Sequence, residues 1–575
     1  LKPRHRVLFV LFSVLFLLAP FYYQDNLGGE GLNLPFNAVV WVPVLVLIGS
    51  GLFTMLFQGR WVRPRYLPAF LVFVGGILVA GFLSGLERPG EWLVRIGVLV
   101  GGMLLWFSLL QMQVKRRELD ALAYLLLASM LIHAMVGILQ LVHQPILKGW
   151  IPVSDAQSLL GMFQQPNLQA SLMATAVALC LYQLLTPSFL SQRWPMKALV
   201  FLTLPLAVFE ILASGSRVGM LGLVLVLALV FTSNIRVWFA RKLVLIVTLV
   251  VIGVGGAAGY TYSDGQLRAY SKLERLAEEG KDARPHIYRI AVDTWSRSPI
   301  IGHGIGSFQR EFQNQRAEYY DPMRGETIDN ARFSHPHNEL LFWMIEGGVV
   351  ALVAIAIAAV AVALQIWRLG LQRGGRVAAL LLPITLHTQV ELPFYISTLH
   401  WIVLVFLLYL AFHTGAKTKI LSLSAGAKRL IQGAVLVCVP LLAVFLTHAL
   451  ASQTGIMQYL KSRGSQPSHL NFALSNLYFR QTGEYFMMRT VLHNGIATKD
   501  ADVVRTYIEW GETFLSQLPD IQVFKDVVLA YAFLDEAANS RRVLDRASSI
   551  YPEEASLKKM IEGDFVIPPK KHRGY

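Results

Sequence analysis

Charged residues are scarce in this chain. Asp, Glu, Lys and Arg make up 15% of its 575 residues, whereas 54% of the residues are hydrophobic. A soluble protein carries about 25% charged residues, so the composition excludes an ordinary water-soluble protein. Cysteine is nearly absent as well. Cys180 and Cys438 both lie in apolar segments, so neither a disulfide nor a cysteine-based metal site is expected.

Basic residues outnumber acidic ones, and the formal net charge is +15. In a soluble protein this excess would suggest a nucleic-acid partner. Here the Lys and Arg residues lie in short loops between apolar segments. We therefore expect no nucleic-acid partner, and a lipid bilayer as the surrounding medium.

Long apolar segments dominate the chain. Val7–Tyr23, Val39–Phe57 and Ala121–Val142 each approach the roughly 20 residues that cross a bilayer core. Hydropathy predicts about thirteen spans, at 7–23, 38–57, 67–84, 93–113, 121–142, 168–186, 198–213, 218–233, 243–261, 338–366, 377–391, 397–412 and 430–450. No small-residue cleavage site follows the first apolar run, so we expect it to be retained. The predicted fold is an all-α polytopic membrane protein.

Lys and Arg alternate between successive loops. One set of seven segments carries 21 basic residues: 2–6, 60–65, 115–117, 193–197, 236–242, 368–376 and 417–429. The positive-inside rule assigns this set to the cytoplasm. With an odd number of spans, the N-terminus is then cytoplasmic and the C-terminus periplasmic, in a bacterial inner membrane.

This topology divides the chain into four predicted parts. Residues 1–262 hold spans one to nine, 263–337 form a large periplasmic loop, 338–450 hold spans ten to thirteen, and 451–575 form a C-terminal periplasmic domain. The last part has no long apolar run, and amphipathic stretches such as Val527–Ile550 predict paired helices. They loosely resemble tetratricopeptide units without a clean 34-residue period.

The first polar group at the expected outer face is Gly161–Asn167, before the sixth span. Pro166 blocks helix continuation, and Asn167 can cap the helix that follows. On these residues alone, a turn with a cap explains the group as well as a binding role for Gln165 and Asn167 does.

The second group, Ala213–Gly219, lies between the seventh and eighth spans and leaves Arg217 almost no loop in which to reach water. An arginine at membrane depth is a functional-site hypothesis by default, and its planar fork of donors suits a pyrophosphate. The alternative is an arginine that extends to the lipid head groups.

The third group is Ser334–Leu341, at the entry to the tenth span. His337 is a candidate general base, and Asn338 is expected to cap the helix. His335 and His337 could instead bind a metal, but no further cluster in the sequence completes a recognisable site. A capping motif with incidental histidines is the simpler alternative.

The fourth group is His387–Tyr395 at the outer end of the eleventh span, where Tyr395 could equally be an interfacial aromatic. Arg95, Arg284 and Arg289 are further candidate phosphate ligands. The charge-derived topology brings all these groups to one face of the membrane. A histidine base beside arginines there suits attack on a sugar carbon that carries a lipid pyrophosphate.

The motifs resemble those of the O-antigen ligase/polymerase superfamily, and most of all the bacterial protein O-oligosaccharyltransferases, or pilin glycosylation ligases. The resemblance rests on Phe163–Asn167, Ser214–Gly219, His335–Leu341 with Glu346 and Gly347, and the Gly-rich stretch Pro299–Phe308.

The resemblance implies that His337 is the essential histidine and that Gln165 and Tyr395 are required polar residues. It also implies that Arg217 binds the pyrophosphate of an undecaprenyl-linked glycan. No metal, nucleotide or other cofactor is implied. His337 would help to remove the acceptor proton in a single inverting displacement. Asn167, Arg95, Arg284, Arg289 and His335 complete the predicted substrate-binding set.

The acceptor and the activity class remain open at the level of sequence. The Gln-Gln-Pro-Asn motif and the C-terminal domain favour Ser or Thr of a pilin or periplasmic protein as acceptor. An O-antigen ligase would use the same donor with lipid A-core as acceptor. A transporter or flippase using His133, Gln140 and Glu391 is a rival from another class. No pair of Gly/Pro-interrupted spans in corresponding halves supports it.

Overall fold

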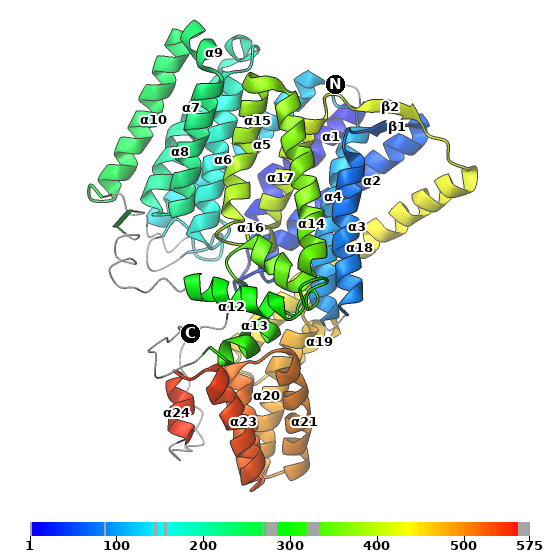
Figure 1. The fold of residues 1–575 in the computed structure, drawn as a ribbon, viewed down its shortest axis with the longest axis vertical. Coiled ribbons are helices and arrows are strands. Elements are labelled where there is room, and N and C mark those ends of the chain that lie inside the picture. The colour runs from blue at the N-terminus through cyan, green and yellow to red at the C-terminus, as the bar shows by residue number, and fades with distance from the viewer. Residues whose placement is uncertain are drawn as a thin grey trace. The chain divides into compact units, whose positions relative to one another are not determined.

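The computed structural model describes residues 3–85, 88–142, 147–153, 158–266, 270–271, 284–319 and 333–561. Within these ranges the chain is almost entirely helical, with one two-stranded ribbon (Figure 1). Seven described helices are long and apolar enough to cross a membrane, and four shorter apolar segments accompany them. The all-α polytopic membrane fold is therefore confirmed.

Each predicted span coincides with a helix. The first is the N-terminal helix, which consists of α1 (Pro3–Ser13) and the helical turns that follow it up to Phe21. The others are α2 (Pro35–Gln58), α3 (Leu67–Leu83), α4 (Pro89–Gln111), α5 (Arg116–Leu141), α6 (Pro166–Leu184), α7 (Trp194–Ala213), α8 (Arg217–Ser233), α10 (Lys242–Tyr262), α14 (Glu339–Arg368), α15 (Gly370–His387), α17 (Thr398–Phe412) and α18 (Ala425–Lys461).

The remaining elements are shorter or belong to the later polar segments. They include α9 (Ile235–Ala240), α12 (Arg284–Ser296), α13 (Phe308–Ala317), α16 (Pro393–Ile396), α19 (Asn471–Ser475), α20 (Arg480–Thr498), α21 (Ala501–Gln517), α22 (Ile521–Phe533), α23 (Ala537–Ile550), α24 (Ala555–Ile561), β1 (Arg60–Arg63) and β2 (Lys417–Ile420).

The chain divides into two compact units, and several helices contribute to both. The first comprises Leu1–Gly75, Val94–Lys281 and Ala354–Met457, and the second Gly76–Leu93, Asp282–Val353 and Gln458–Tyr575.

Helix α6 forms the centre of the first unit, and nearly every side chain from Leu168 to Leu184 is buried. It packs against α5, α7, α8 and α15. Small residues allow close contacts, as is common between membrane helices. A Cβ on Gly255 of α10 would lie 2.3 Å from the Pro205 carbonyl oxygen of α7, and one on Gly219 of α8 2.5 Å from Ala170 of α6.

The basic segments of the first unit meet at one end of its bundle. β1 pairs antiparallel with β2, with Arg60 opposite Ile420. Arg241 donates to the Leu184 carbonyl at the C-terminus of α6, and Arg376 donates to the adjacent Leu185 carbonyl. These cations lie at the negative end of the helix dipole. The segments of Arg60 and Lys417 thus lie side by side, and those of Arg241 and Arg376 lie at the same end of α6.

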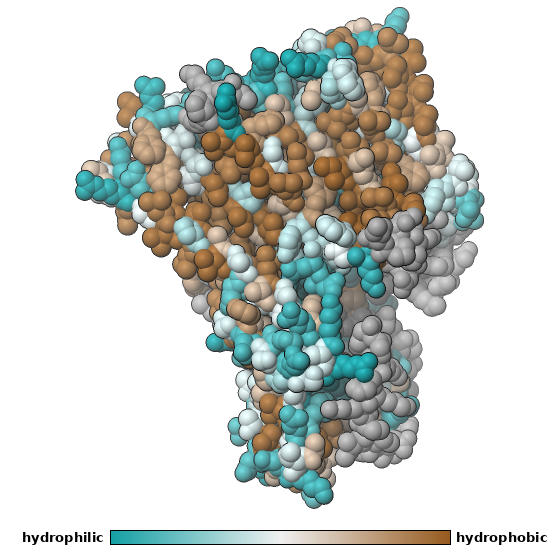
Figure 2. Space-filling model, turned by 180° about the vertical axis from the view of Figure 1, so that it is seen from behind, coloured by the Kyte–Doolittle hydropathy of each residue, from teal (hydrophilic) through white to brown (hydrophobic). Residues whose placement is uncertain are grey.

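Apolar side chains face outward over much of the bundle. On the face shown in Figure 2 they form a broad hydrophobic band, with hydrophilic residues gathered at the end of the bundle. Leu243 on α10 and Leu430 on α18 are 74% and 75% exposed. Such side chains are stable in contact with lipid rather than water.

The second unit contains a kink in α14 at Gly348, where φ is 60° and ψ is −160°. The Gly-rich segment 299–308 fills this kink. The N–H groups of Val349 and Val350 donate to the carbonyls of Pro299 and Ile300, and those of His303 and Gly304 donate to the carbonyls of Ile345 and Glu346. The backbone groups released by the kink are thus satisfied.

The C-terminal part of the second unit is a stack of helices α20 to α24 around its own apolar core, which includes Tyr507, Phe524 and Val527. Asp500 and Asp520 cap α21 and α22 by accepting two backbone N–H bonds each. The paired helices predicted around Val527–Ile550 are present as α22 and α23, with Asp535 in a left-handed turn between them. Helix α13, from the predicted periplasmic loop, packs against α23.

Candidate active site

The loop that leads into α6 is held by one buried side chain, Gln140 of α5. Its amide oxygen accepts the N–H groups of Leu160 and Gly161, and its amide nitrogen donates to the carbonyls of Pro152 and Gly161. Both ends of the amide are thereby engaged. Gln140, which a transporter could have used, serves instead to fix the loop ahead of Gln165.

Gln165 is the residue before α6, in extended conformation, and Pro166 is the first helical residue. The Gln165 amide nitrogen donates to Oε2 of Glu391 at 3.3 Å. Its Oε1 is buried and accepts no hydrogen bond from any described residue. A buried amide oxygen without a donor requires an explanation, and a substrate hydroxyl is a suitable donor for it.

Asn167 does not cap α6, which corrects the sequence-based expectation. It lies inside the first turn, and the position before the helix belongs to Gln165. Asn167 instead accepts a 2.8 Å hydrogen bond from the hydroxyl of Ser216. The same hydroxyl oxygen accepts the Gly219 N–H and so caps α8.

Arg217 is the first residue of α8 and is half-buried. Within the described ranges, no hydrogen bond or ion pair engages its guanidinium. The Ser216–Asn167 bond joins the N-terminus of α8 to that of α6. Two helix N-termini and an unengaged guanidinium suit an anion such as pyrophosphate.

Tyr395 and Arg95 form a pair in the first unit. Nη2 of Arg95 donates to the Tyr395 hydroxyl at 3.0 Å, and the guanidinium lies 4.6 Å from the centre of the tyrosine ring. Tyr395 is half-buried in the short helix α16. The two side chains therefore hold each other in place. An aromatic residue that only marks the lipid interface would not need such a partner.

Buried polar residues connect α15, α17 and α6. Ser171 of α6 lies 2.8 Å from Nδ1 of His387 and 3.4 Å from Nε2 of His400. Nε2 of His400 also lies 3.1 Å from the Leu168 carbonyl oxygen. This network fixes the N-terminal half of α6 against the segment that carries Glu391.

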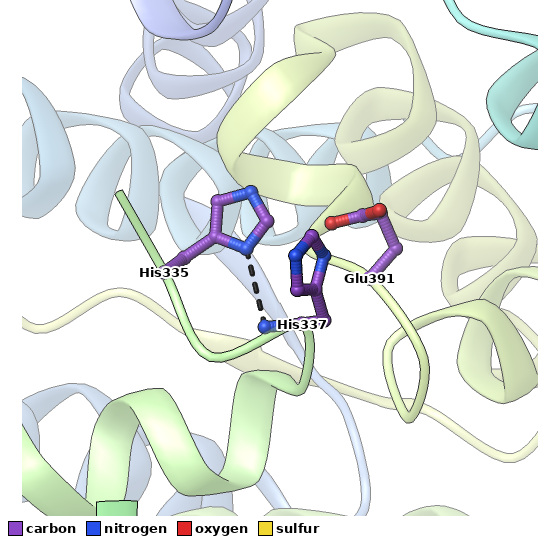
Figure 3. Close-up of side chains that lie close together, drawn as sticks. All are labelled: His335, His337 and Glu391. Carbon is purple, nitrogen blue, oxygen red and sulfur yellow. Dashed lines mark hydrogen bonds between the residues drawn. The ribbon is translucent and has the colours of Figure 1, made fainter. Parts of the chain in front are cut away.

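His335 and His337 precede α14 in the second unit (Figure 3). The His337 backbone N–H donates to Nδ1 of His335 at 3.2 Å, so Nδ1 of His335 carries no proton. The His337 φ of 53° is left-handed, which is uncommon for a residue other than glycine. Asn338 accepts the Leu341 N–H and caps α14 as predicted. The turn therefore fixes the backbone from which the His337 ring extends.

Glu346 supports the same region from inside α14. Its fully buried carboxylate accepts the N–H groups of Gly306 and Phe308 through Oε1. His303 is held on the other side, with Nε2 2.8 Å from the Thr294 carbonyl oxygen of α12. The Gly-rich segment and the helix that follows His337 are therefore mutually braced.

Arg284 and Arg289 both lie on α12, in the second unit. Arg284 is its first helical residue. Arg289 is exposed, and its guanidinium lies 5.3 Å from the centre of the Tyr319 ring. The predicted set thus divides between the units: Arg95, Gln165, Asn167, Arg217 and Tyr395 belong to the first, and Arg284, Arg289, His335 and His337 to the second.

Two family models match this chain. The model of the O-antigen ligase family matches residues 198–356, which include Arg217 and His337. A model of the C-terminal part of virulence-factor membrane-bound polymerases matches residues 376–561, which include Tyr395. The chain belongs to the O-antigen ligase/polymerase superfamily. A comparison with curated proteins finds no match.

Membership of the ligase/polymerase superfamily supports glycan transfer of the O-antigen ligase type, from a lipid-linked oligosaccharide donor in a membrane setting. Arg95, Gln165 and Asn167 lie outside both matched segments. Sequence reasoning treated Glu391 only as a possible transport residue. Its position four residues before Tyr395, in the same polar group, was the signal that could have linked it to this site.

Proposed function

We propose that this ligase/polymerase superfamily member transfers a preassembled glycan from undecaprenyl pyrophosphate to Ser or Thr hydroxyls of a pilin or periplasmic protein. The observation that carries the proposal is Arg217, a half-buried guanidinium at a helix N-terminus with no acceptor among the described residues. A charge kept at membrane depth without a protein partner indicates a ligand of opposite charge.

In the proposed reaction, His337 takes the proton of the acceptor hydroxyl as its oxygen attacks the anomeric carbon. The bond from that carbon to the pyrophosphate oxygen breaks as the new glycosidic bond forms, and the anomeric configuration inverts. Arg217 and the N-termini of α6 and α8 stabilise the charge that develops on the departing pyrophosphate. The unengaged Oε1 of Gln165 accepts a hydroxyl of the bound sugar. No metal is proposed to take part.

A protein acceptor is supported by the stacked helices α20 to α23. Successive antiparallel helices of this kind present extended surfaces that commonly bind other proteins. The expected setting is the periplasmic face of a bacterial inner membrane, as the charge distribution of the loops predicts.

Lipid A-core is the second candidate acceptor, because the segment that includes Arg217 and His337 matches the O-antigen ligase model. Donor and catalytic groups would be unchanged. Transport is less well supported. Gln140 is fully engaged with the loop before α6, and the His133 ring stacks on Phe163 with centroids 4.9 Å apart.

The deciding experiment incubates the purified protein in detergent with an undecaprenyl-pyrophosphate glycan and either a pilin or a core lipid, with EDTA present. Glycan on the pilin supports the proposal, and glycan on the core lipid supports the ligase alternative. The same incubation without EDTA is the comparison. Absence of transfer to either acceptor in both conditions contradicts both candidates, and transfer that occurs only without EDTA contradicts metal-independent chemistry.

A further inference from the structure

An apolar groove of about 460 Å³ opens on the surface of the first unit. Its walls come from the end of the N-terminal helix, from α2 and from α18, and include Leu18, Val42 and Leu446. Leu18 and Val42 are 65% and 39% exposed. No charged side chain lines it, so the groove is suited to a hydrocarbon ligand rather than to water.

The groove forms where regular helix geometry is interrupted. The N-terminal helix changes from α-helical to π-helical at Val14–Leu18 and to a 3-10 turn at Ala19–Phe21. Pro43, on the facing wall, lies inside α2 and cannot donate a backbone hydrogen bond. Single π-helical turns are rare and occur frequently at functional sites.

Polar residues connect the groove lining to the loop before α6. Tyr22, in the groove lining, donates its hydroxyl to Gln24, and Gln24 donates to the Leu450 carbonyl of α18. Asn26 donates to the Gln24 carbonyl and accepts a 3.1 Å bond from the amide of Gln164. A continuous hydrogen-bonded path thus joins the groove to the residue before Gln165.

A second connection runs through the start of α2. Asn37 immediately precedes Ala38 of the groove wall. Its side chain donates to the Ile396 carbonyl and accepts the Thr398 N–H, both at 2.8 Å. The same helix end therefore lines the groove and fixes the segment that carries Tyr395.

We propose that this groove binds the polyisoprenoid chain of the donor lipid. The inference rests on the proposed function, because only a lipid-linked donor has a long apolar chain attached to the anion. If the pyrophosphate binds at Arg217, at the N-terminus of α8, the attached lipid chain must run from there into the bilayer. Hydrogen-bonded connections link the groove to Gln164 and to the Tyr395 segment, and its apolar lining suits such a chain.

The test fills the groove and varies the chain length of the donor. Val42→Trp places a large ring in the groove, and Val46→Trp is the matched control. Val46 is also 39% exposed and lies one helical turn further along α2, but it does not line the groove. Transfer kinetics are measured with donors that carry the same glycan pyrophosphate on an undecaprenyl or a farnesyl chain.

We expect Val42→Trp to raise KM for the undecaprenyl donor about tenfold, which corresponds to about 1.4 kcal/mol. KM for the farnesyl donor is expected to change little, and Val46→Trp to leave both values unchanged. Equal effects of the two variants, or equal effects on both donors, overturn the proposal. No transfer by the unmodified protein from any lipid pyrophosphate overturns the proposed function instead.

A second measurement does not depend on turnover. A photoreactive benzoylphenylalanine at position 42 is expected to cross-link the undecaprenyl donor in membrane vesicles, and one at position 46 is not. Cross-linking at position 42 to phospholipid acyl chains alone, with donor present, overturns the proposal and assigns the groove to bulk lipid.

Discussion

The hydroxyl of Ser216 donates to Oδ1 of Asn167 at 2.8 Å and in turn accepts the N–H of Gly219. One side chain thus caps α8 and joins it to the first turn of α6. Because Arg217 follows Ser216 directly, this bond fixes the backbone of Arg217 relative to the Gln165 end of α6. Its removal is therefore expected to weaken donor binding.

A double-mutant cycle on Ser216→Ala and Asn167→Ala tests this relationship. The inter-helix bond contributes about 0.5–1.5 kcal/mol, so the two substitutions are expected to be non-additive by about that amount in KM for the donor. Ser216→Ala alone also removes the helix cap, which costs about 1 kcal/mol of stability. Additive effects of the two substitutions on KM would show that the bond does not position Arg217.

Arg217→Ala is expected to lower kcat by about 100- to 1,000-fold, the usual effect of removing one group that stabilises transition-state charge. Thermal stability in detergent is expected to change little, since the guanidinium makes no hydrogen bond or ion pair with a described residue. Arg236→Ala, at an exposed position in α9, is the control and should leave kcat unchanged. An active Arg217→Ala enzyme, or one that unfolds, contradicts the proposed role.

The membrane fold was accessible from sequence because apolar length and loop charge are local properties. Every predicted span falls on a helix, and the histidine motif was correctly placed at the capped start of α14. Long-range packing was not accessible. The buried Glu210 of α7 fits only because Gly137 of α5 leaves room for it, with a Cβ there lying 2.2 Å from Oε1.

Side-chain partners in the candidate site also depended on tertiary structure. Asn167 was expected to cap its own helix, yet it accepts from Ser216, which is 49 residues away in the chain. The pairing of Arg95 with Tyr395 spans 300 residues. Contacts between residues so far apart in the chain produce no periodic pattern in the sequence. The sequence could therefore indicate which residue types matter, but not which of them contact one another.

The kink of α14 gives a stability prediction. Gly348→Ala is expected to destabilise the protein by about 3 kcal/mol or more, because this backbone conformation is essentially restricted to glycine and the new Cβ would lie 2.3 Å from the Ile300 carbonyl oxygen. Gly370→Ala is the control. Its φ of 74° is also left-handed, but nothing lies within 4 Å, so about 1–2 kcal/mol is expected. Equal losses in a detergent unfolding assay contradict the proposed bracing.

Alkaline pH is expected to loosen the C-terminal helices. Burial, and next the charge of Asp526, raise the pKa of Tyr507 above its ordinary value of 10.0. Above pH 10 the unfolded state loses this proton while the folded state keeps it, so stability falls as pH rises. Tyr507→Phe should therefore shift proteolytic cleavage of residues 458–561 to higher pH. Tyr260→Phe, at an exposed tyrosine of α10, is the control and should leave the profile unchanged.

His337→Gly separates the proposed base from the backbone that carries it. The left-handed φ of 53° is more favourable for glycine than for histidine, so the turn before α14 should persist. Transfer is expected to fall by about 100- to 10,000-fold, the usual contribution of general base catalysis, and added imidazole should restore part of it. Imidazole should not rescue Arg217→Ala, which lacks a different group. A His337→Gly enzyme with full activity, or one that folds and binds donor but gains nothing from imidazole, would mean that another group removes the acceptor proton.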